Sequence, residues 1–274
     1  MATLVSFHAH PDDEAIATGG TLAKASAEGH RVVVVFATNG ERGSAPEELL
    51  EPGESLAERR AKEAMRAAEI LGVHRLEFLG YRDSGMMGDV GNHDPRSFWR
   101  ADIEEAADRL AAILQEERAD VVTVYDKTGV TGHPDHVRVH AVGTRAAHLA
   151  ATPRIYEATL SRSQAERLVA QAILLEAIDT RLDVDLGEFG TPDEVITTVV
   201  DVGGHLEQKR RAIAAHASQV SETSFFLNLP PDTFSQLWGR EYFVRQPRSA
   251  TGKRETTLVP GGADDRPVGA KTPH

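Results

Sequence analysis

Hydrophobic and polar positions follow two periods along this chain, one typical of buried strands and one typical of amphipathic helices. Residues 31–37 form a continuous β-branched run of the kind buried on both faces of a parallel sheet. Residues 97–118 place their apolar side chains at helical spacing. Up to residue 150 we expect strands at 3–7, 31–37, 75–79 and 120–125, and helices at 14–28, 55–71, 97–118 and 134–150. This alternation predicts an α/β fold with a doubly wound, mostly parallel sheet and helices on both faces.

The later part of the chain repeats the alternation less regularly, with a strand, a helix, a strand and a helix expected at 154–159, 163–178, 195–201 and 203–218. Residues 179–194 are acidic and rich in turn residues, which is typical of a surface insertion. From Pro247 onward the chain is rich in glycine, proline and charge, which favours disorder. We therefore expect a core at 1–160, a smaller C-terminal annex that completes the fold and the substrate pocket at 161–246, and a disordered tail at 247–274.

Composition narrows the classes of function. The 274 residues carry a formal net charge of −12, which argues against nucleic acid or an anionic membrane as the main partner. The chain contains no cysteine, so any metal site must use nitrogen and oxygen ligands. Residues 1–7 run into a strand without a secretory pattern, and no stretch is apolar for long enough to cross a bilayer. We expect a cytoplasmic protein with a small-molecule partner. The sequence leaves open whether the protein forms a homo-oligomer.

A cluster of histidine and carboxylate residues stands where the first expected strand gives way to a helix. It comprises His10, Pro11, Asp12, Asp13 and Glu14. Residues three apart on a first helical turn share a face, so His10 and Asp13 can reach one cation while Asp12 faces an open coordination position. Acidic residues are also common at helix starts, but His10 directly before Pro11 favours the metal interpretation. His8 faces the same side as His10, and we interpret it as structural.

A second cluster follows the strand at 120–125 after a glycine-bearing loop. It comprises His133, Pro134, Asp135 and His136. Two interpretations stay open: both histidines bind metal, or one binds metal while the other, oriented by Asp135, acts as a general acid or stabilises the transition state. Catalytic zinc sites usually keep three protein ligands and one water, which favours the second interpretation. His140 and His148 follow without a Pro-Asp context, and we interpret both as surface residues.

Both clusters lie at the carboxyl end of an expected strand, where open α/β sheets bind their ligands. Two such strand ends can meet at one cleft although they are far apart in sequence. A divalent ion held there would lower the pKa of its water to about 7 and polarise a carbonyl oxygen. The two clusters together therefore predict a hydrolytic metal centre.

Several motifs occur in one order along residues 1–150. They are Ala9-His10-Pro11-Asp12-Asp13-Glu14, Thr38-Asn39-Gly40-Glu41-Arg42-Gly43, Arg60, Glu63, Ile70-Leu71-Gly72, Asp83-Ser84-Gly85-Met86 and Gly132-His133-Pro134-Asp135-His136. In this order they resemble the LmbE-like, or PIG-L, N-acetylglucosaminyl deacetylases, which include mycothiol- and bacillithiol-type deacetylases and amidases. Beyond residue 150 the resemblance is weaker and rests on Lys209, the stretch 216–219 and Glu241.

The resemblance implies a Rossmann-like fold that binds one Zn²⁺, or Fe²⁺, per chain through His10, Asp13 and His136. It implies that Asp12 is the general base and that His133, oriented by Asp135, is a general acid or oxyanion partner. The sequence departs from the mycothiol-type enzymes at Thr131, where they carry an aromatic residue that can help to stabilise the oxyanion.

Four further residues are candidates for contact with the substrate. The resemblance suggests Arg60 and Asp83 as contacts to sugar hydroxyls, and Met86 belongs to the same motif as Asp83. Judged from the residues alone, Arg60 lies on a highly charged helix and is expected at the surface. Asp83 has the context of an Asx turn, and Arg42, beside glycines, either closes the pocket or pairs with a neighbour.

The expected function is metal-dependent hydrolysis of an amide, which removes an N-acetyl or related acyl group from an N-acetylglucosamine-type conjugate. A mycothiol-conjugate-type amidase acting on a larger thiol conjugate is the alternative within the family. One rival is a two-metal phosphoesterase, for which His93 and Asp94 are the additional ligand candidates. Another is a non-catalytic sugar-binding protein, against which the intact Asp12 and His133 argue.

Overall fold

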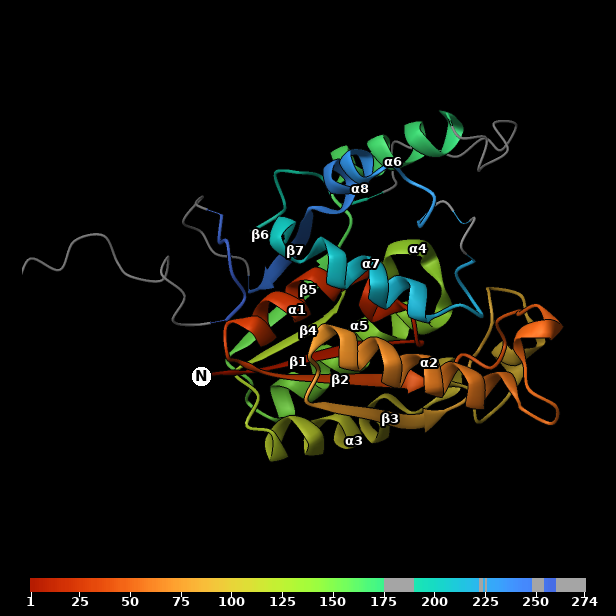
Figure 1. Cartoon of the computed structure of the whole chain (residues 1–274). Coiled ribbons are helices and arrows are strands. Elements are labelled where there is room, and N and C mark those ends of the chain that lie inside the picture. Colours follow the sequence, from red (N-terminus) through yellow and green to blue (C-terminus); the bar gives the residue numbers. More distant parts are fainter. Residues whose placement is uncertain (175–189, 222–223, 225, 248–253, 260–274) are drawn as a thin grey trace, which may run out of the picture.

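The computed structural model describes residues 1–174, 190–221, 224, 226–247 and 254–259. Within them, seven strands form one sheet in the order β3-β2-β1-β4-β5-β7-β6 (Figure 1). They are β1 (Thr3–His8), β2 (Arg31–Thr38), β3 (Arg75–Tyr81), β4 (Val121–Tyr125), β5 (Arg154–Thr159), β6 (Thr198–Asp201) and β7 (Arg240–Gln246). Strands β1 to β5 are parallel, and β7 is antiparallel to both β5 and β6. The expected α/β fold with a mostly parallel sheet is confirmed.

Helices cover both faces of the sheet (Figure 1). On one face lie α1 (Gly19–Ala27), α2 (Leu56–Leu71) and α7 (Leu206–Ala215), and on the other lie α3 (Ile103–Glu116) and α5 (Pro134–Leu149). The short α4 (Gly129–Gly132) precedes α5, whereas α6 (Arg162–Leu174) and α8 (Pro231–Trp238) pack against each other. Single turns of π- or 3-10 helix are found at Glu14–Thr18, Glu47–Leu49, Val90–His93, Phe98–Arg100 and Gly203–His205.

Local signals in the sequence explain where the elements begin and end. Ser55 and Glu58 form a capping box, in which the Glu58 carboxylate accepts from the Ser55 amide at 2.8 Å and the Ser55 hydroxyl accepts from the Glu58 amide at 3.2 Å. Gly72 ends α2 in the left-handed conformation, with φ at 71°. The helix expected at 97–118 begins only at Ile103, because an aspartate at 102 caps it there.

Part of the expected disordered tail lies ordered against the sheet. Glu255 pairs with Thr198 of β6, and its carboxylate accepts a hydrogen bond from the Tyr156 hydroxyl at 2.8 Å. Leu258 and Val259 are buried. The prediction of disorder is therefore wrong for residues 254–259, because their polar and apolar side chains find partners on β5 and β6. Outside the described residues lie 248–253 and 260–274 of the tail, and 175–189, where the expected insertion and the end of the helix at 163–178 fall.

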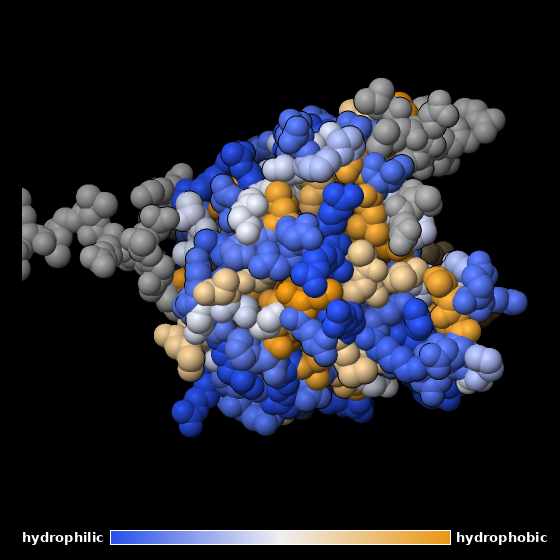
Figure 2. Space-filling model, in the orientation of Figure 1, coloured by the Kyte–Doolittle hydropathy of each residue, from blue (hydrophilic) through white to orange (hydrophobic). Residues whose placement is uncertain are grey.

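The face of the molecule seen in Figure 2 is mostly hydrophilic, with apolar side chains gathered between α7 and the pair formed by α6 and α8. A mainly apolar cavity of about 310 Å³ lies among these helices, lined in part by Leu168, Phe226 and Trp238. The strands of the expected annex, β6 and β7, extend the same sheet as the core. None of the helices in the described part of the chain is long and apolar enough to cross a bilayer.

Candidate metal centre

The neighbouring strands β1 and β4 bring the two histidine clusters together at their carboxyl ends. His10 lies two residues beyond β1, and His133 and His136 lie at the start of α5. One ring nitrogen from each of these three histidines lies within 4.8 Å of the others. A second group with this spacing shares His10 and His133 and adds Asp83 and Asp135. The described residues therefore contain one compact centre rich in nitrogen and oxygen ligands.

The carboxylate of Asp13 lies between two of the imidazoles. Its Oδ2 is 3.5 Å from Nδ1 of His10, and its Oδ1 is 3.4 Å from Nε2 of His136. The His10 amide donates to Oδ2 at 2.8 Å, which fixes the carboxylate within its turn. Although burial raises it, the pKa of Asp13 is held well below its ordinary value by His136 and His10. An ionised carboxylate thus faces both imidazoles.

The remaining nitrogen of each imidazole contacts an acceptor on the protein. Nε2 of His10 lies 3.2 Å from the carboxylate of Asp135 and 3.5 Å from that of Asp83. Nδ1 of His136 lies 3.2 Å from the carbonyl oxygen of Gly129. With a cation bound beside Asp13, these outer nitrogens would keep their protons, and Nδ1 of His10 and Nε2 of His136 would offer their lone pairs to the cation. These are the two nitrogens that face Asp13.

Negative charge surrounds His10. Burial lowers the pKa of His10, but the carboxylates of Asp13, Asp135 and Asp83 outweigh burial and hold that pKa well above its ordinary value. Surroundings that stabilise a positive charge on this imidazole also favour a cation bound beside it. The donor set of two imidazoles and a carboxylate therefore fits a divalent ion in both its chemistry and its electrostatics.

His133 accepts a hydrogen bond from the backbone, whereas the outer nitrogens of His10 and His136 face acceptors. Its Nδ1 accepts a hydrogen bond from the Asp135 amide at 3.1 Å, so its proton lies on Nε2. Burial, with the neighbouring His10 and His136, lowers the pKa of His133 to about 4. His133 is therefore a neutral imidazole that presents an N–H group near the other two rings.

Asp135 contacts two of the histidines, His10 through its side chain and His133 through its backbone amide. Its carboxylate contacts Nε2 of His10 and accepts from the Ser84 amide at 2.9 Å and from the Ser84 hydroxyl. Its contact with the ring of His133 comes from its backbone amide. Orientation of His133 by Asp135 stays a prediction, which this amide supports, while the fully buried carboxylate faces His10. The sequence places Asp135 beside His133 but cannot show that the loop carrying Ser84 approaches from the other side.

Asp12 occupies a strained backbone conformation at the edge of the centre. Its φ is 112°, a region that non-glycine residues rarely adopt and that persists at functional sites when the surroundings impose it. Its amide donates to the Glu14 carboxylate at 3.0 Å, and the other oxygen of Glu14 lies 2.7 Å from Nε2 of His216. Burial and the adjacent Asp13 raise the pKa of Asp12 to about 6, although the Arg60 charge opposes them.

Arg60 lies beneath the centre and only 4% of it is exposed, so its expected position at the surface is wrong. Its guanidinium donates to the carbonyl oxygens of Pro11 and Gly40 and lies 3.5 Å from the Asp12 carboxylate. The charge is buried because it ties two loops together, which the charged pattern of α2 does not reveal. The contact to a sugar hydroxyl suggested for Arg60 stays a prediction.

The loop at 80–96 carries the other candidate contacts. Asp83 forms the expected Asx turn by accepting from the Gly85 amide at 2.8 Å, and it also faces His10. Arg42 pairs with a neighbour, since its guanidinium donates to Asp89 at 3.1 Å. Met86 is 59% exposed on this loop. Of these, the structure brings only Asp83 into direct contact with the candidate metal centre.

Several supporting residues were not identified from the sequence. Ser84 holds Asp135, and the carbonyl of Gly129 holds His136. His8, interpreted as structural, is fully enclosed and bonds the Tyr125 hydroxyl at 2.8 Å, and the Tyr125 ring packs 4.8 Å from that of His136. No residue pattern signals these contacts, because Ser84 and His8 meet partners far away in sequence and the Gly129 carbonyl reaches His136 only through the conformation of the turn before α5.

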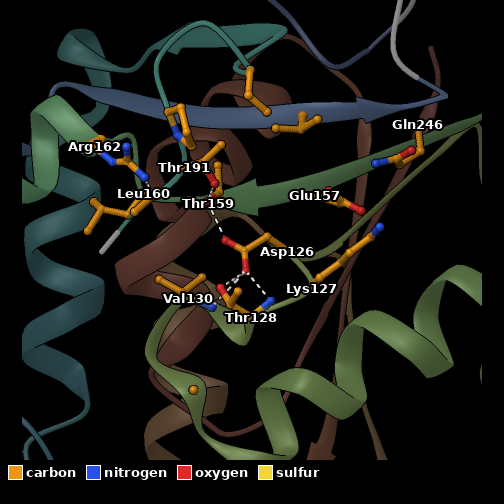
Figure 3. Close-up of a pocket in the computed structure, with 15 residues that line it drawn as sticks. Asp126, Lys127, Thr128, Val130, Glu157, Thr159, Leu160, Arg162, Thr191 and Gln246 are labelled. Carbon is orange, nitrogen blue, oxygen red and sulfur yellow. Dashed lines mark hydrogen bonds between the residues drawn. The ribbon is translucent and has the colours of Figure 1, made fainter. Parts of the chain in front are cut away.

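The sequence predicts that both His140 and His148 lie at the surface. His148 is exposed as expected, but His140 is half-buried and its Nδ1 lies 3.0 Å from the Tyr125 carbonyl oxygen, so its surface assignment is wrong. The side chain of Thr131 lies outside the described residues. A cavity of about 770 Å³ adjoins the segment before His133 (Figure 3). It is lined by Val130 and Gly132, and by charged residues from the turn after β4, from β5 and from α6. The candidate ligands do not line it.

Comparisons with known proteins find relatives over almost the whole chain. A family model described as "PIG-L: GlcNAc-PI de-N-acetylase" matches residues 5–147. A protein of Thermomonospora curvata named 1D-myo-inositol 2-acetamido-2-deoxy-alpha-D-glucopyranoside deacetylase is 42% identical over 283 residues, which cover 93% of this chain and 95% of that protein. A protein of the same name from Thermobifida fusca is 38% identical and covers 93% of this chain and 98% of its own length.

Among solved structures, an N,N'-diacetylchitobiose deacetylase from Pyrococcus horikoshii is similar to this chain with a TM-score of 0.54. Its sequence is 26% identical, and the superposition covers 89% of this chain and 84% of that protein. The similarity therefore includes strands and helices well beyond residue 147, where the family model ends.

Proposed function

This chain belongs to the PIG-L family of de-N-acetylases, and on that premise we propose that it hydrolyses the N-acetyl amide of 1D-myo-inositol 2-acetamido-2-deoxy-α-D-glucopyranoside. The resemblance stated from the ordered motifs is confirmed. The named relatives are deacetylases of N-acetylglucosamine-type substrates, which agrees with the class of function expected from the sequence. Two relatives with this inositol glycoside in their names align over 93% of the chain, and this supports the specific substrate.

One observation carries the proposal: Nδ1 of His10 and Nε2 of His136 face the two oxygens of one ionised carboxylate, that of Asp13. We assign these three residues as the ligands of one divalent ion per chain, Zn²⁺ or Fe²⁺. Three nitrogen and oxygen ligands leave room for solvent, as catalytic zinc sites require. Bound there, the ion would supply a water of lowered pKa and polarise the amide carbonyl of the substrate.

Asp12 is the proposed general base. Its carboxylate is adjacent to the ligand Asp13 in sequence and retains 19% exposure, so it can meet solvent within the site. A pKa of about 6 suits a group that must accept a proton from the attacking water and release it again near neutral pH. We propose that Asp12 then passes this proton to the nitrogen of the broken C–N bond, which leaves acetate and a free amino sugar.

His133 is the proposed oxyanion partner. Because its Nδ1 accepts from the Asp135 amide, its Nε2–H is the group available to a developing negative charge. Its pKa of about 4 keeps the ring neutral at the pH where Asp12 is ionised, so His133 donates a hydrogen bond and not a proton. Between the two roles left open by the sequence, this polarity favours stabilisation of the oxyanion over general acid catalysis.

The substrate contacts are proposed with different roles. Asp83 faces the centre and is the proposed sugar contact, whereas Arg60 ties Pro11, the residue before Asp12, to Gly40 on the loop after β2. Arg42 and Met86 belong to the rim formed with the loop at 80–96, where the exposed Met86 can meet the part of the substrate away from the amide.

The test measures release of a primary amine from 1D-myo-inositol 2-acetamido-2-deoxy-α-D-glucopyranoside, together with metal content. With Zn²⁺ or Fe²⁺ added, we expect turnover by the wild type and one ion per chain. Asp12→Ala is expected to keep the ion and to lose about 10²- to 10⁴-fold in kcat, as the removal of a general base does. Asp201→Ala, which changes an exposed carboxylate at the end of β6, is the matched control and should retain both the ion and the turnover of the wild type.

Each rival predicts a different result. Absence of amine release from any N-acetylglucosaminide, with the ion bound, would favour a non-catalytic sugar-binding protein. Two ions per chain would favour the phosphoesterase, although His93 and Asp94 belong to neither of the metal-competent groups among the described residues. Turnover of a thiol conjugate but not of the inositol glycoside would favour the amidase.

A further inference from the structure

The turn between β4 and α5 is organised by one carboxylate. Oδ1 of Asp126 accepts from the Thr128 amide at 2.9 Å, the Thr128 hydroxyl at 2.7 Å and the Val130 amide at 3.1 Å. Its Oδ2 accepts from the Thr159 hydroxyl of β5 at 2.6 Å, and that hydroxyl is in turn bonded to Thr191. Figure 3 shows Asp126 at the centre of these bonds, between the turn and β5. Three hydrogen bonds thus fold the turn, and a fourth ties it to the sheet.

The turn needs this support because its backbone is strained. Val130 has φ and ψ of 61° and −55°, a conformation that β-branched residues essentially avoid. Such outliers persist only where surrounding contacts impose them. The Val130 amide is one of the groups bonded to Asp126, so the carboxylate acts directly on the strained residue.

The strained turn lies against the candidate metal ligand His136. The carbonyl of Gly129 faces Nδ1 of His136 at 3.2 Å, and a Cβ atom added at Gly129 would come within 2.7 Å of the Cβ of His136. Gly129 also has φ at 67°, which glycine adopts without strain. The turn and the histidine are therefore packed so closely that a shift of Gly129 must move the carbonyl away from His136.

We propose that Asp126 is a positioning residue for His136, an inference that rests on the proposed role of His136 as a metal ligand. By folding residues 126–130, Asp126 aims the Gly129 carbonyl at Nδ1 and so keeps the proton there. The Nε2 lone pair is then free to face the ion. The partners that orient metal-bound histidines typically change metal affinity by about 10- to 100-fold when they are lost.

The test compares Asp126→Ala with Asp126→Asn. Asp126→Asn keeps an oxygen for the Val130 amide, so it should retain the Zn²⁺ affinity of the wild type. In a chelator competition, the Zn²⁺ affinity of Asp126→Ala should be about 10- to 100-fold lower. Histidine ¹⁵N NMR of the metal-free protein at alkaline pH should show the Nδ1–H form of His136 in the wild type and a mixture of forms in Asp126→Ala. Asp201→Ala, which removes a similar turn bond to the Gly203 amide, is the matched control.

One further variant, which combines two substitutions, keeps the test decisive if Asp126→Ala does not fold. Thr128→Ala combined with Thr159→Val removes two donors to Asp126 and should give a smaller loss of affinity in the same direction. Unchanged Zn²⁺ affinity and an unchanged His136 tautomer in these variants would overturn the proposal. The tautomer is measured without metal or substrate. The result therefore stays valid even if the protein does not deacetylate the inositol glycoside.

Discussion

The two histidine clusters are similar in sequence but differ in how their side chains are used. In the first, His10 and Asp13 face each other where the ion is proposed; in the second, His136 faces Asp13 there, while Nδ1 of His133 accepts from the backbone. Both pairs are three residues apart at the start of a helix. Their difference comes from what the second nitrogen of each ring meets: carboxylates, a carbonyl or an amide. Spacing brings residues together, whereas the surrounding hydrogen bonds decide which imidazole binds metal.

The clusters also differ in how they are supported. His10 is held by carboxylates from two separate places, Asp83 on a loop and Asp135 on α5. His136 donates a hydrogen bond to one turn, whose conformation depends on Asp126. The first cluster therefore has redundant support, and we expect it to tolerate the loss of one supporting group better than the second does.

The largest effect is expected from Asp13→Ala. This change removes the carboxylate that faces both imidazoles, so the protein should lose the metal ion and nearly all turnover, by at least about 10³-fold. Metal analysis after dialysis checks this directly. Full metal content in Asp13→Ala would show that the three imidazoles suffice to bind the ion. His133 would then be a ligand like His136, and the proposed difference between the clusters would be wrong.

A smaller effect is expected from His133→Ala. Loss of one hydrogen-bond donor to an oxyanion typically costs about 10²- to 10³-fold in kcat, and the ion should stay bound. Metal content and kcat, measured on the same preparation, separate this result from that of Asp13→Ala. Release of the ion from His133→Ala would make His133 a ligand.

Asp135→Asn is expected to act on metal affinity through His10. The amide keeps the shape of the carboxylate but removes its charge, so Zn²⁺ affinity should fall about 10- to 100-fold. Because Asp83 remains beside the same nitrogen, we expect the lower part of this range. A chelator competition measures it, and Ser84→Ala, which frees one oxygen of Asp135, should change the affinity in the same direction by less.

The smallest effect is a shift in the pH profile of Arg60→Gln. Protonated Asp12 cannot accept a proton, so kcat falls as the pH drops through the pKa of Asp12. That pKa is about 6 in the metal-free protein, and the positive charge of a bound ion would lower it. The Arg60 charge also lowers this pKa. Its removal should therefore move the acidic limb of the kcat profile to higher pH. A limb that stays in place would exclude Asp12 as the titrating base.

Much of the fold was predictable from the sequence, because local patterns carry it. The β-branched run of β2, the capping box of Ser55 and the glycine after α2 act within a few residues of themselves. The convergence of His10, Asp13 and His136 was predictable as well, since parallel strands end at the same edge of a sheet. These are properties of spacing and strand order.

The supporting contacts were not predictable in the same way. Arg60 reads as a surface residue because its helix is charged, and only the approach of two loops buries it. Asp135 neighbours His133 in sequence but points to His10, because Ser84 arrives from the loop at 80–96. Such roles depend on which distant backbone fills the space beside a side chain, which no single-chain pattern encodes.

The most direct measurement of the central claim is X-ray absorption at the zinc edge, which counts the imidazoles bound to the ion. We expect two imidazoles together with oxygen ligands in the Zn²⁺-loaded wild type, and the same two in His133→Ala. Three imidazoles in the wild type that fall to two in His133→Ala would contradict the assignment of Asp13, and not His133, as the third ligand.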